Sequence, residues 1–123
     1  MSIGQKFSRG DVVLLPISFV IGTGQKTRPV VVIQNDNLNA RLQSTLVAII
    51  TSTNKRAASE PKQLFIDVST PDGFATGLLH PSTVKCEHLD TVNQQAIHRH
   101  IGRFSQALMD QLEVCLKRAM ELS

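Results

Sequence analysis

Apolar residues alternate with polar ones in several short runs along the first two thirds of the chain. Runs of this kind, rich in β-branched residues and bounded by turn-forming residues, are typical of β-strands. They predict five strands and a shorter sixth, at residues 11–17, 29–34, 45–51, 63–68, 83–87 and 100–104. The segments between them that are rich in Gly, Asn and Asp predict turns, at residues 22–24, 35–39 and 71–77.

The last segment of the chain has a helical period instead. After Ser105, which can serve as an N-cap, apolar residues recur at spacings of three and four, at Leu108, Leu112, Cys115, Leu116 and Ala119. On the polar side, Glu113 and Lys117 have the i, i+4 order that favours an ion pair worth ~0.3 kcal/mol. The pattern therefore predicts a mainly β protein, a small and strongly bent sheet closed by one C-terminal helix.

Length and composition limit the class of protein. A chain of 123 residues with 41% hydrophobic residues fits a single folded domain over residues 1–123. No apolar run approaches the roughly 20 residues of a membrane span, and the first residues do not resemble a secretory signal. We therefore expect a cytoplasmic protein without a membrane partner. The net charge of +3 is compatible with an anionic partner, but it also suits many proteins that bind none.

The residue types that often carry chemistry give few signals by themselves. Cys86 and Cys115 have apolar neighbours and no CxxC partner, which predicts buried, reduced thiols. His98 and His100 lack a third ligand at a suitable spacing, so we expect no metal site. A Gly-rich phosphate loop, a GxSxG elbow and an HExxH helix are absent from the sequence, so nucleotide hydrolysis by those routes is not supported.

The alternation at residues 83–87 is the most informative local pattern. In a strand it directs Val84 and Cys86 to one face and Thr83, Lys85 and Glu87 to the other. A cation and a carboxylate then share a face. Two interpretations remain open at this point, an ordinary surface ion pair and a functional site.

Hydroxyl and basic residues follow the predicted third strand. Thr51, Ser52 and Thr53 form a run of hydroxyls where the strand ends, which fits either simple turn capping or a site. The loop that follows offers Lys55 and Arg56 for contact with phosphates, although a solvated loop has the same composition.

Five segments in order resemble the motifs of the MazF, PemK and Kid family of toxin endoribonucleases. They are RGDVVLL at 9–15, TRPVVVIQND at 27–36, LVAIITS at 46–52, VKCEHLDTV at 84–92 and HIGRFS at 100–105. The resemblance spans nearly the whole chain. It implies a small SH3-like barrel of the CcdB/PemK type with a C-terminal helix. It also implies a homodimer that cuts single-stranded RNA without a metal or cofactor and that binds a cognate antitoxin of the MazE/PemI type.

The resemblance also implies roles for individual residues. Arg28 falls on the family's catalytic arginine and Thr51 on its catalytic threonine, while Lys85 and Glu87 fall where Kid has an arginine and the aspartate proposed as base. Pro29 and the buried strand behind it give Arg28 a rigid support from which to meet a phosphate. The residues expected to contact RNA are Lys26, Ser52, Thr53, Lys55 and Arg56.

Two alternatives without catalysis also fit a barrel of this type, because a fold does not fix a function. One is a CcdB-like toxin that poisons DNA gyrase, although such toxins depend on a C-terminal Trp-Gly-Ile and this chain has no tryptophan. The other is an inactive barrel that binds RNA or an antitoxin. The segment GTGQ at 22–25, which lacks the acidic residue of many family members, makes this second alternative conceivable.

Overall fold

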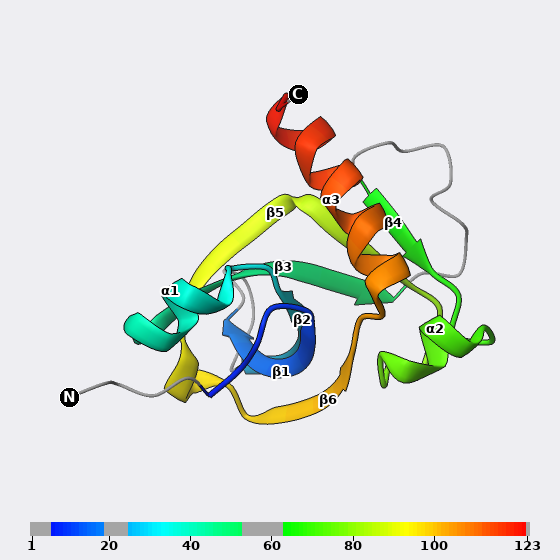
Figure 1. The fold of residues 1–123 in the computed structure, drawn as a ribbon. Coiled ribbons are helices and arrows are strands. Elements are labelled where there is room, and N and C mark those ends of the chain that lie inside the picture. Colours follow the sequence, from blue (N-terminus) through cyan, green and yellow to red (C-terminus); the bar gives the residue numbers. More distant parts are fainter. Residues whose placement is uncertain (1–5, 19–24, 53–62, 123) are drawn as a thin grey trace.

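The computed structural model describes residues 6–18, 25–52 and 63–122. These residues form one curled, six-stranded antiparallel sheet in the order β4-β5-β3-β2-β1-β6, with a C-terminal helix packed on it (Figure 1). The strands are β1 (Asp11–Ser18), β2 (Gln25–Val32), β3 (Ser44–Ser52), β4 (Gln63–Ile66), β5 (Ser82–Asn93) and β6 (Arg99–Arg103). The expected mainly β architecture with a terminal helix is confirmed.

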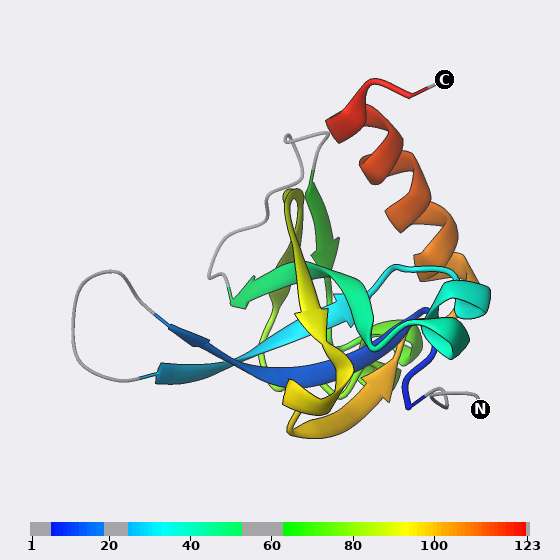
Figure 2. The same cartoon turned by 90° about the vertical axis from the view of Figure 1, so that its left-hand side faces the viewer.

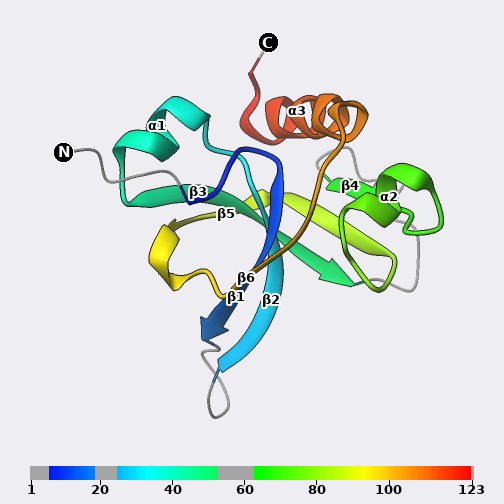
Figure 3. The same ribbon diagram turned by 60° about the horizontal axis from the view of Figure 1, so that its bottom comes forward.

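All six predicted strands are present, with differences at their ends. β5 continues to Asn93, six residues beyond the predicted end, because it pairs with the whole length of β3. β2 begins four residues earlier than predicted, at Gln25, because it continues as an arm paired with β1 (Figure 2). β4 and β6 form the two edges of the sheet, and β6 lies beside β1 (Figure 3).

Two segments predicted as turns contain short helices instead. Residues 35–39 begin α1 (Asp36–Arg41), and residues 71–77 contain α2 (Pro71–Ala75). The reason is that Asn and Thr, which favour turns, also cap helices. Asn35 accepts a hydrogen bond from the Leu38 backbone N–H, and Thr70 accepts one from that of Gly73. A 3₁₀ turn (Gln94–Ala96) follows β5, and the predicted turn at 22–24 lies outside the described residues.

The C-terminal helix α3 (Gln106–Met120) covers one face of the sheet (Figure 2). Its N-cap is Ser105, as predicted, whose hydroxyl accepts from the Leu108 backbone N–H. The i, i+4 order of Glu113 and Lys117 gives no ion pair here, because Glu113 instead pairs with Arg9 across the fold, at 3.3 Å. None of the helices within the described ranges is long and apolar enough to cross a membrane.

The sheet buries apolar side chains on both faces, and the strand period decides which residue faces which side. The larger cluster lies under α3 and contains Val12, Val31, Ala48, Ile50, Val84, Cys86 and the apolar residues of the helix. The smaller cluster lies on the opposite face and contains Val13, Leu15, Val30, Val32, Val47, Ile49 and Ile97. Neighbouring residues of β1, β2 and β3 thus alternate between the two clusters.

Buried polar contacts connect distant parts of the chain. The Asp11 carboxylate accepts a hydrogen bond from Arg103 Nη1 at 2.6 Å, which joins the RGD segment to the IGR segment. The fully buried Asn39 connects α1 to the sheet, since its side-chain oxygen accepts from Thr45 Oγ1 at 2.7 Å and from Gln34 Nε2 at 2.9 Å. Both contacts satisfy groups that would be costly to bury alone.

Gly77 permits a close approach that determines how the turn after α2 packs. It has φ +77°, and a Cβ at this position would lie 2.0 Å from the Ile101 carbonyl oxygen on β6. Gly10 also has a positive φ, +96°, but a Cβ there would meet nothing nearer than Met109 Sδ at 3.4 Å.

We therefore expect Gly77→Ala to destabilise the protein more than Gly10→Ala. Backbone strain alone should lower the free energy of unfolding by about 1–2 kcal/mol at Gly10. At Gly77 the displaced backbone should add about 1–3 kcal/mol to that loss. Urea unfolding of the two variants measures the difference, and equal losses would contradict the assigned contact with Ile101.

Candidate functional site

Arg28 and Thr51 lie at the same end of neighbouring strands. The last pair that β2 makes with β3 at this end is Val30 with Ile49. Arg28 stands two residues before Val30, and Thr51 stands two residues after Ile49. The strand period therefore directs both side chains to the face of the smaller cluster, away from α3.

β5 brings further polar residues to this end of the sheet. Thr83 lies opposite Thr51 in the β3–β5 ladder, and Lys85 lies opposite Ile49. Residues directly opposite in an antiparallel pair project from the same face, with Cβ atoms about 4.5–5.5 Å apart. Thr51, Thr83 and Lys85 therefore share the face to which Arg28 is directed.

Glu87 lies where the β3–β5 ladder changes register. Ala48 pairs with Leu89, but the next residue, Ile49, pairs with Lys85, so residues 86–88 have no partner on β3. β5 bends sharply along its length, as Figure 1 shows. This irregularity leaves Glu87 exposed, two residues beyond Lys85 and on the same side of the strand.

The structure does not form the surface ion pair that the 83–87 spacing also permitted. Ion pairs within the described ranges join Arg9 with Glu113, and Asp11 with His100 and Arg103, but not Lys85 with Glu87. The Glu87 carboxylate instead accepts a hydrogen bond from Gln63 Nε2 at 2.8 Å.

Gln63 is a neighbour of the site that sequence reasoning missed. It begins β4 and lies opposite Lys85, so it belongs to the same face. The only indication in the sequence was its place in an alternating run of residues. Such a run shows which face of a strand a residue occupies, but it does not show which residue of another strand it contacts. The contact with Glu87 depends on the pairing of two strands that are far apart in the chain.

The cysteines lie on the other side of the sheet, as predicted. Cys86 and Cys115 are both buried and free, and the Cys115 thiol donates to the Gln63 carbonyl oxygen at 3.5 Å. Burial raises the pKa of the Cys86 thiol to about 12, with smaller contributions from Cys115 and Glu87, and burial also raises the pKa of Cys115. Neither thiol is therefore activated as a nucleophile at neutral pH.

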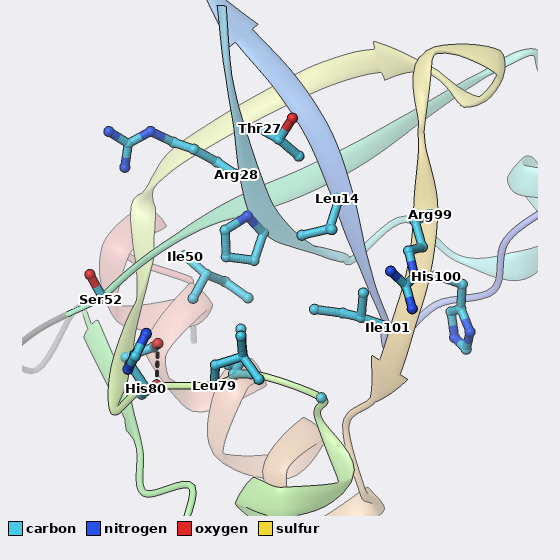
Figure 4. Close-up of a pocket in the computed structure, with 14 residues that line it drawn as sticks. Leu14, Thr27, Arg28, Ile50, Ser52, Leu79, His80, Arg99, His100 and Ile101 are labelled. Atoms are coloured by element: carbon cyan, nitrogen blue, oxygen red, sulfur yellow. Dashed lines mark hydrogen bonds between the residues drawn. The ribbon is translucent and has the colours of Figure 1, made fainter.

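A cavity of about 500 Å³ opens beside Arg28 (Figure 4). Its floor is apolar and its rim carries cationic and hydroxyl groups. The Arg28 guanidinium points away from the apolar side chains at its centre. The lining residues are Leu14, Thr27, Arg28, Pro29, Ile50, Ser52, Gly77, Leu78, Leu79, His80, Ser82, Arg99, His100 and Ile101. None of them is acidic, so the cavity is suited to an anionic ligand with an apolar part.

The residues expected to contact RNA are only partly described. Ser52 is exposed at the end of β3 and lines the cavity. Lys26 belongs to β2, two residues before Arg28, but its side chain is not described. Thr53, Lys55 and Arg56 lie outside the described residues. Within the described ranges, no group of three or more His, Cys, Asp or Glu residues is placed to hold a metal ion.

The curled sheet with a terminal helix and a cation-bearing end defines a class of small β proteins, and sequence comparison identifies the family. The PemK-like, MazF-like toxins of type II toxin–antitoxin systems match residues 8–120. Endoribonuclease MazF6 of Mycobacterium tuberculosis is 30% identical over 97 residues, which cover 79% of this chain and 81% of the relative. Endoribonuclease EndoA of Bacillus subtilis is 30% identical over 115 residues, which cover 93% and 94%. The chain therefore belongs to this family of toxin endoribonucleases.

Solved structures agree on the fold. The Mycobacterium tuberculosis toxin MazF-mt6 superimposes with a TM-score of 0.72 at 21% identity, covering 92% of this chain and 98% of that one. A mycobacterial endoribonuclease in complex with its cognate antitoxin gives a TM-score of 0.73 at 17% identity, covering 94% and 96%. At these identities the likeness shows the shared fold, and the roles of individual residues need an argument from the site itself.

Proposed function

We propose that this protein is the toxin of a type II toxin–antitoxin pair and cleaves single-stranded RNA through attack of the substrate's own 2′-OH. Family membership supports the reaction class. The observation that carries the proposal is the convergence of Arg28, Thr51 and Lys85 on one face at one end of the sheet, with the Glu87 carboxylate beside them. This set provides a base, donors for phosphate oxygens and a cation for the leaving group.

Proton removal starts the reaction. Glu87 is exposed and takes the proton of the 2′-OH, whose oxygen then bonds to the adjacent phosphorus. The bond between phosphorus and the 5′-oxygen breaks, and the 5′-oxygen takes a proton from solvent water, so the products carry a 2′,3′-cyclic phosphate and a 5′-OH. Gln63, which donates to one oxygen of Glu87 at 2.8 Å, holds the carboxylate and leaves its other oxygen for the 2′-OH.

The remaining groups stabilise charge on the phosphate. Arg28 has a forked set of donors that matches two non-bridging oxygens, and Thr51 donates one hydrogen bond to them. Lys85 offsets the negative charge that develops on the leaving 5′-oxygen. The cavity beside Arg28 opens on the opposite face of the sheet, because Ile50 and Ser52 of its lining alternate with Thr51 along β3. The proposed reaction therefore uses only the face that carries Thr51 and Lys85.

The proposal includes two protein partners. The relatives of known structure include a MazE–MazF assembly from Deinococcus radiodurans, with a TM-score of 0.71 at 14% identity, and the mycobacterial toxin with its antitoxin described above. By analogy with these assemblies, this chain binds an acidic antitoxin of the MazE/PemI type, and the family resemblance implies that it does so as a homodimer. The net charge of +3 is complementary to such a partner.

The first test replaces the nucleophile in the substrate. A mixed-sequence single-stranded RNA should be cut in EDTA, leaving 2′,3′-cyclic phosphate and 5′-OH ends. Once a cut site is mapped, substituting hydrogen for its 2′-OH should abolish cleavage and leave binding largely intact, because the attacking oxygen is gone. Cleavage of the 2′-deoxy substrate would refute the mechanism. Binding of RNA without any cleavage would instead identify an inactive barrel.

Substitutions test the roles of the protein groups. Arg28→Ala should lower the cleavage rate at least ~100-fold, because a principal donor to the phosphate is lost. Glu87→Gln keeps the shape of the side chain and removes the base, so it should also cost ~100-fold or more. Arg118→Ala and Glu121→Gln, which change the same charges on exposed parts of the C-terminal segment, are the matched controls and should cut at the parent rate. A Glu87→Gln variant that cuts at the parent rate would show that the proton leaves by another route.

The assembly is tested without any assay of cleavage. Sedimentation at micromolar concentration should give the mass of a dimer, as the family resemblance implies. Addition of an acidic antitoxin of the MazE/PemI type should give a larger complex whose affinity falls as salt is raised. A stable monomer over the micromolar range would contradict the proposed dimer.

A further inference from the structure

The Thr83 hydroxyl is the exception among the buried polar atoms of the described residues. Thr83 is 3% exposed, and its Oγ1 is the single buried side-chain nitrogen or oxygen in these ranges that lacks a hydrogen-bond partner. Buried polar groups are nearly always paired, and an unpaired one points to a hydrogen bond whose partner is not engaged in the resting state. The question is which group that partner is.

The strand ladders restrict the answer. Thr83 lies on β5 between Thr51 of β3 and Phe65 of β4, which are its two cross-strand neighbours. Phe65 offers no side-chain hydrogen-bonding group, whereas Thr51 offers a hydroxyl. Thr–Thr pairs directly opposite each other in an antiparallel sheet are close enough to form a hydrogen bond. Of the two cross-strand neighbours, Thr51 is therefore the one whose side chain can pair with the Thr83 hydroxyl.

We propose that Thr83 is a positioning residue whose hydroxyl donates a hydrogen bond to Thr51 Oγ1 when Thr51 donates one to the scissile phosphate. This inference rests on the proposed role of Thr51. A threonine hydroxyl can donate one hydrogen bond and accept two. Thr51 can therefore donate to the phosphate and accept a hydrogen bond from Thr83 at the same oxygen. The bond from Thr83 holds the Thr51 proton toward the substrate, and consecutive hydrogen bonds strengthen each other.

A purely structural role does not account for Thr83. The other buried threonines in the described ranges have partners, since Thr45 donates to Asn39 at 2.7 Å and Thr76 donates to the Gly73 carbonyl oxygen at 2.6 Å. Their hydroxyls contribute to the stability of the resting fold. The Thr83 hydroxyl makes no such bond, so its removal is not expected to weaken the fold.

The test measures stability and activity together. Thr83→Val should leave Tm unchanged or raise it by up to about 5 °C, because no bond is lost and an unpaired hydroxyl is removed. The same variant should lower kcat on single-stranded RNA about tenfold, the value of one hydrogen bond, with KM nearly unchanged. Thr83→Ser restores the hydroxyl and should recover most of the rate, and Thr83→Ala serves as a second variant without a hydroxyl.

The matched control is Thr45→Val on the neighbouring strand. It removes a buried hydroxyl that has a partner, so it should lower Tm by about 3–8 °C and leave kcat within about twofold of the parent value. If Thr83→Val lowers Tm as much as Thr45→Val does, the Thr83 hydroxyl is structural and the inference is overturned.

A mutant cycle separates this inference from the proposed function. If Thr83 acts through Thr51, Thr83→Val should cause no further loss in a Thr51→Val background. A tenfold loss in both backgrounds would overturn the inference, as would a parental kcat for Thr83→Val when Thr51→Val is impaired. If Thr51→Val itself cuts at the parental rate, the role of Thr51 in the proposed function fails first.

Discussion

The pairing of β3 with β5, and the change of register within it, determines most of the functional end of the molecule. β3 is buried on both faces and forms ladders with β2 and β5, so it fixes the positions of both neighbours. The shift after Ala48 leaves three residues of β5 without partners and bends that strand. Glu87 is exposed as a result, while Thr83 and Lys85 remain fixed opposite β3. A continuous ladder would give the sheet a different curvature and a different position for Glu87.

One face of the sheet carries most of the hydrophobic core, and the other carries the candidate site. Under α3 the larger apolar cluster supplies most of the burial that stabilises the fold. The opposite face carries the smaller cluster and, at one end, the candidate site. This separation allows charged groups to be exposed at the site without disturbing the helix-covered core. It also explains why Cys86, which lies between Lys85 and Glu87 in the sequence, belongs to the core and has a thiol with a raised pKa.

The site end of the sheet combines a rigid backbone at Arg28 with a buried hydroxyl that lacks a hydrogen-bond partner, that of Thr83. Arg28 lies within β2, two residues before three valines that are fully buried, so its backbone has little freedom. Thr83 retains a buried hydroxyl without a hydrogen-bond partner, which lowers the stability of the fold. A residue with a purely structural role would not require that hydroxyl. Functional sites commonly tolerate such losses of stability, because their side chains are positioned to bind a substrate and not to stabilise the fold without it.

The sequence by itself determined the strands, the terminal helix with its Ser105 cap, and the faces of Val84, Cys86, Lys85 and Glu87, because these follow from local period and capping chemistry. It did not determine the short helices at α1 and α2, because their residue types favour turns and caps equally. Only the tertiary structure decided that Glu113 pairs with Arg9, that Gln63 holds Glu87 and that Thr83 faces Thr51. These contacts join residues that are far apart in the chain, and their geometry depends on strand order and register, which a local pattern does not contain.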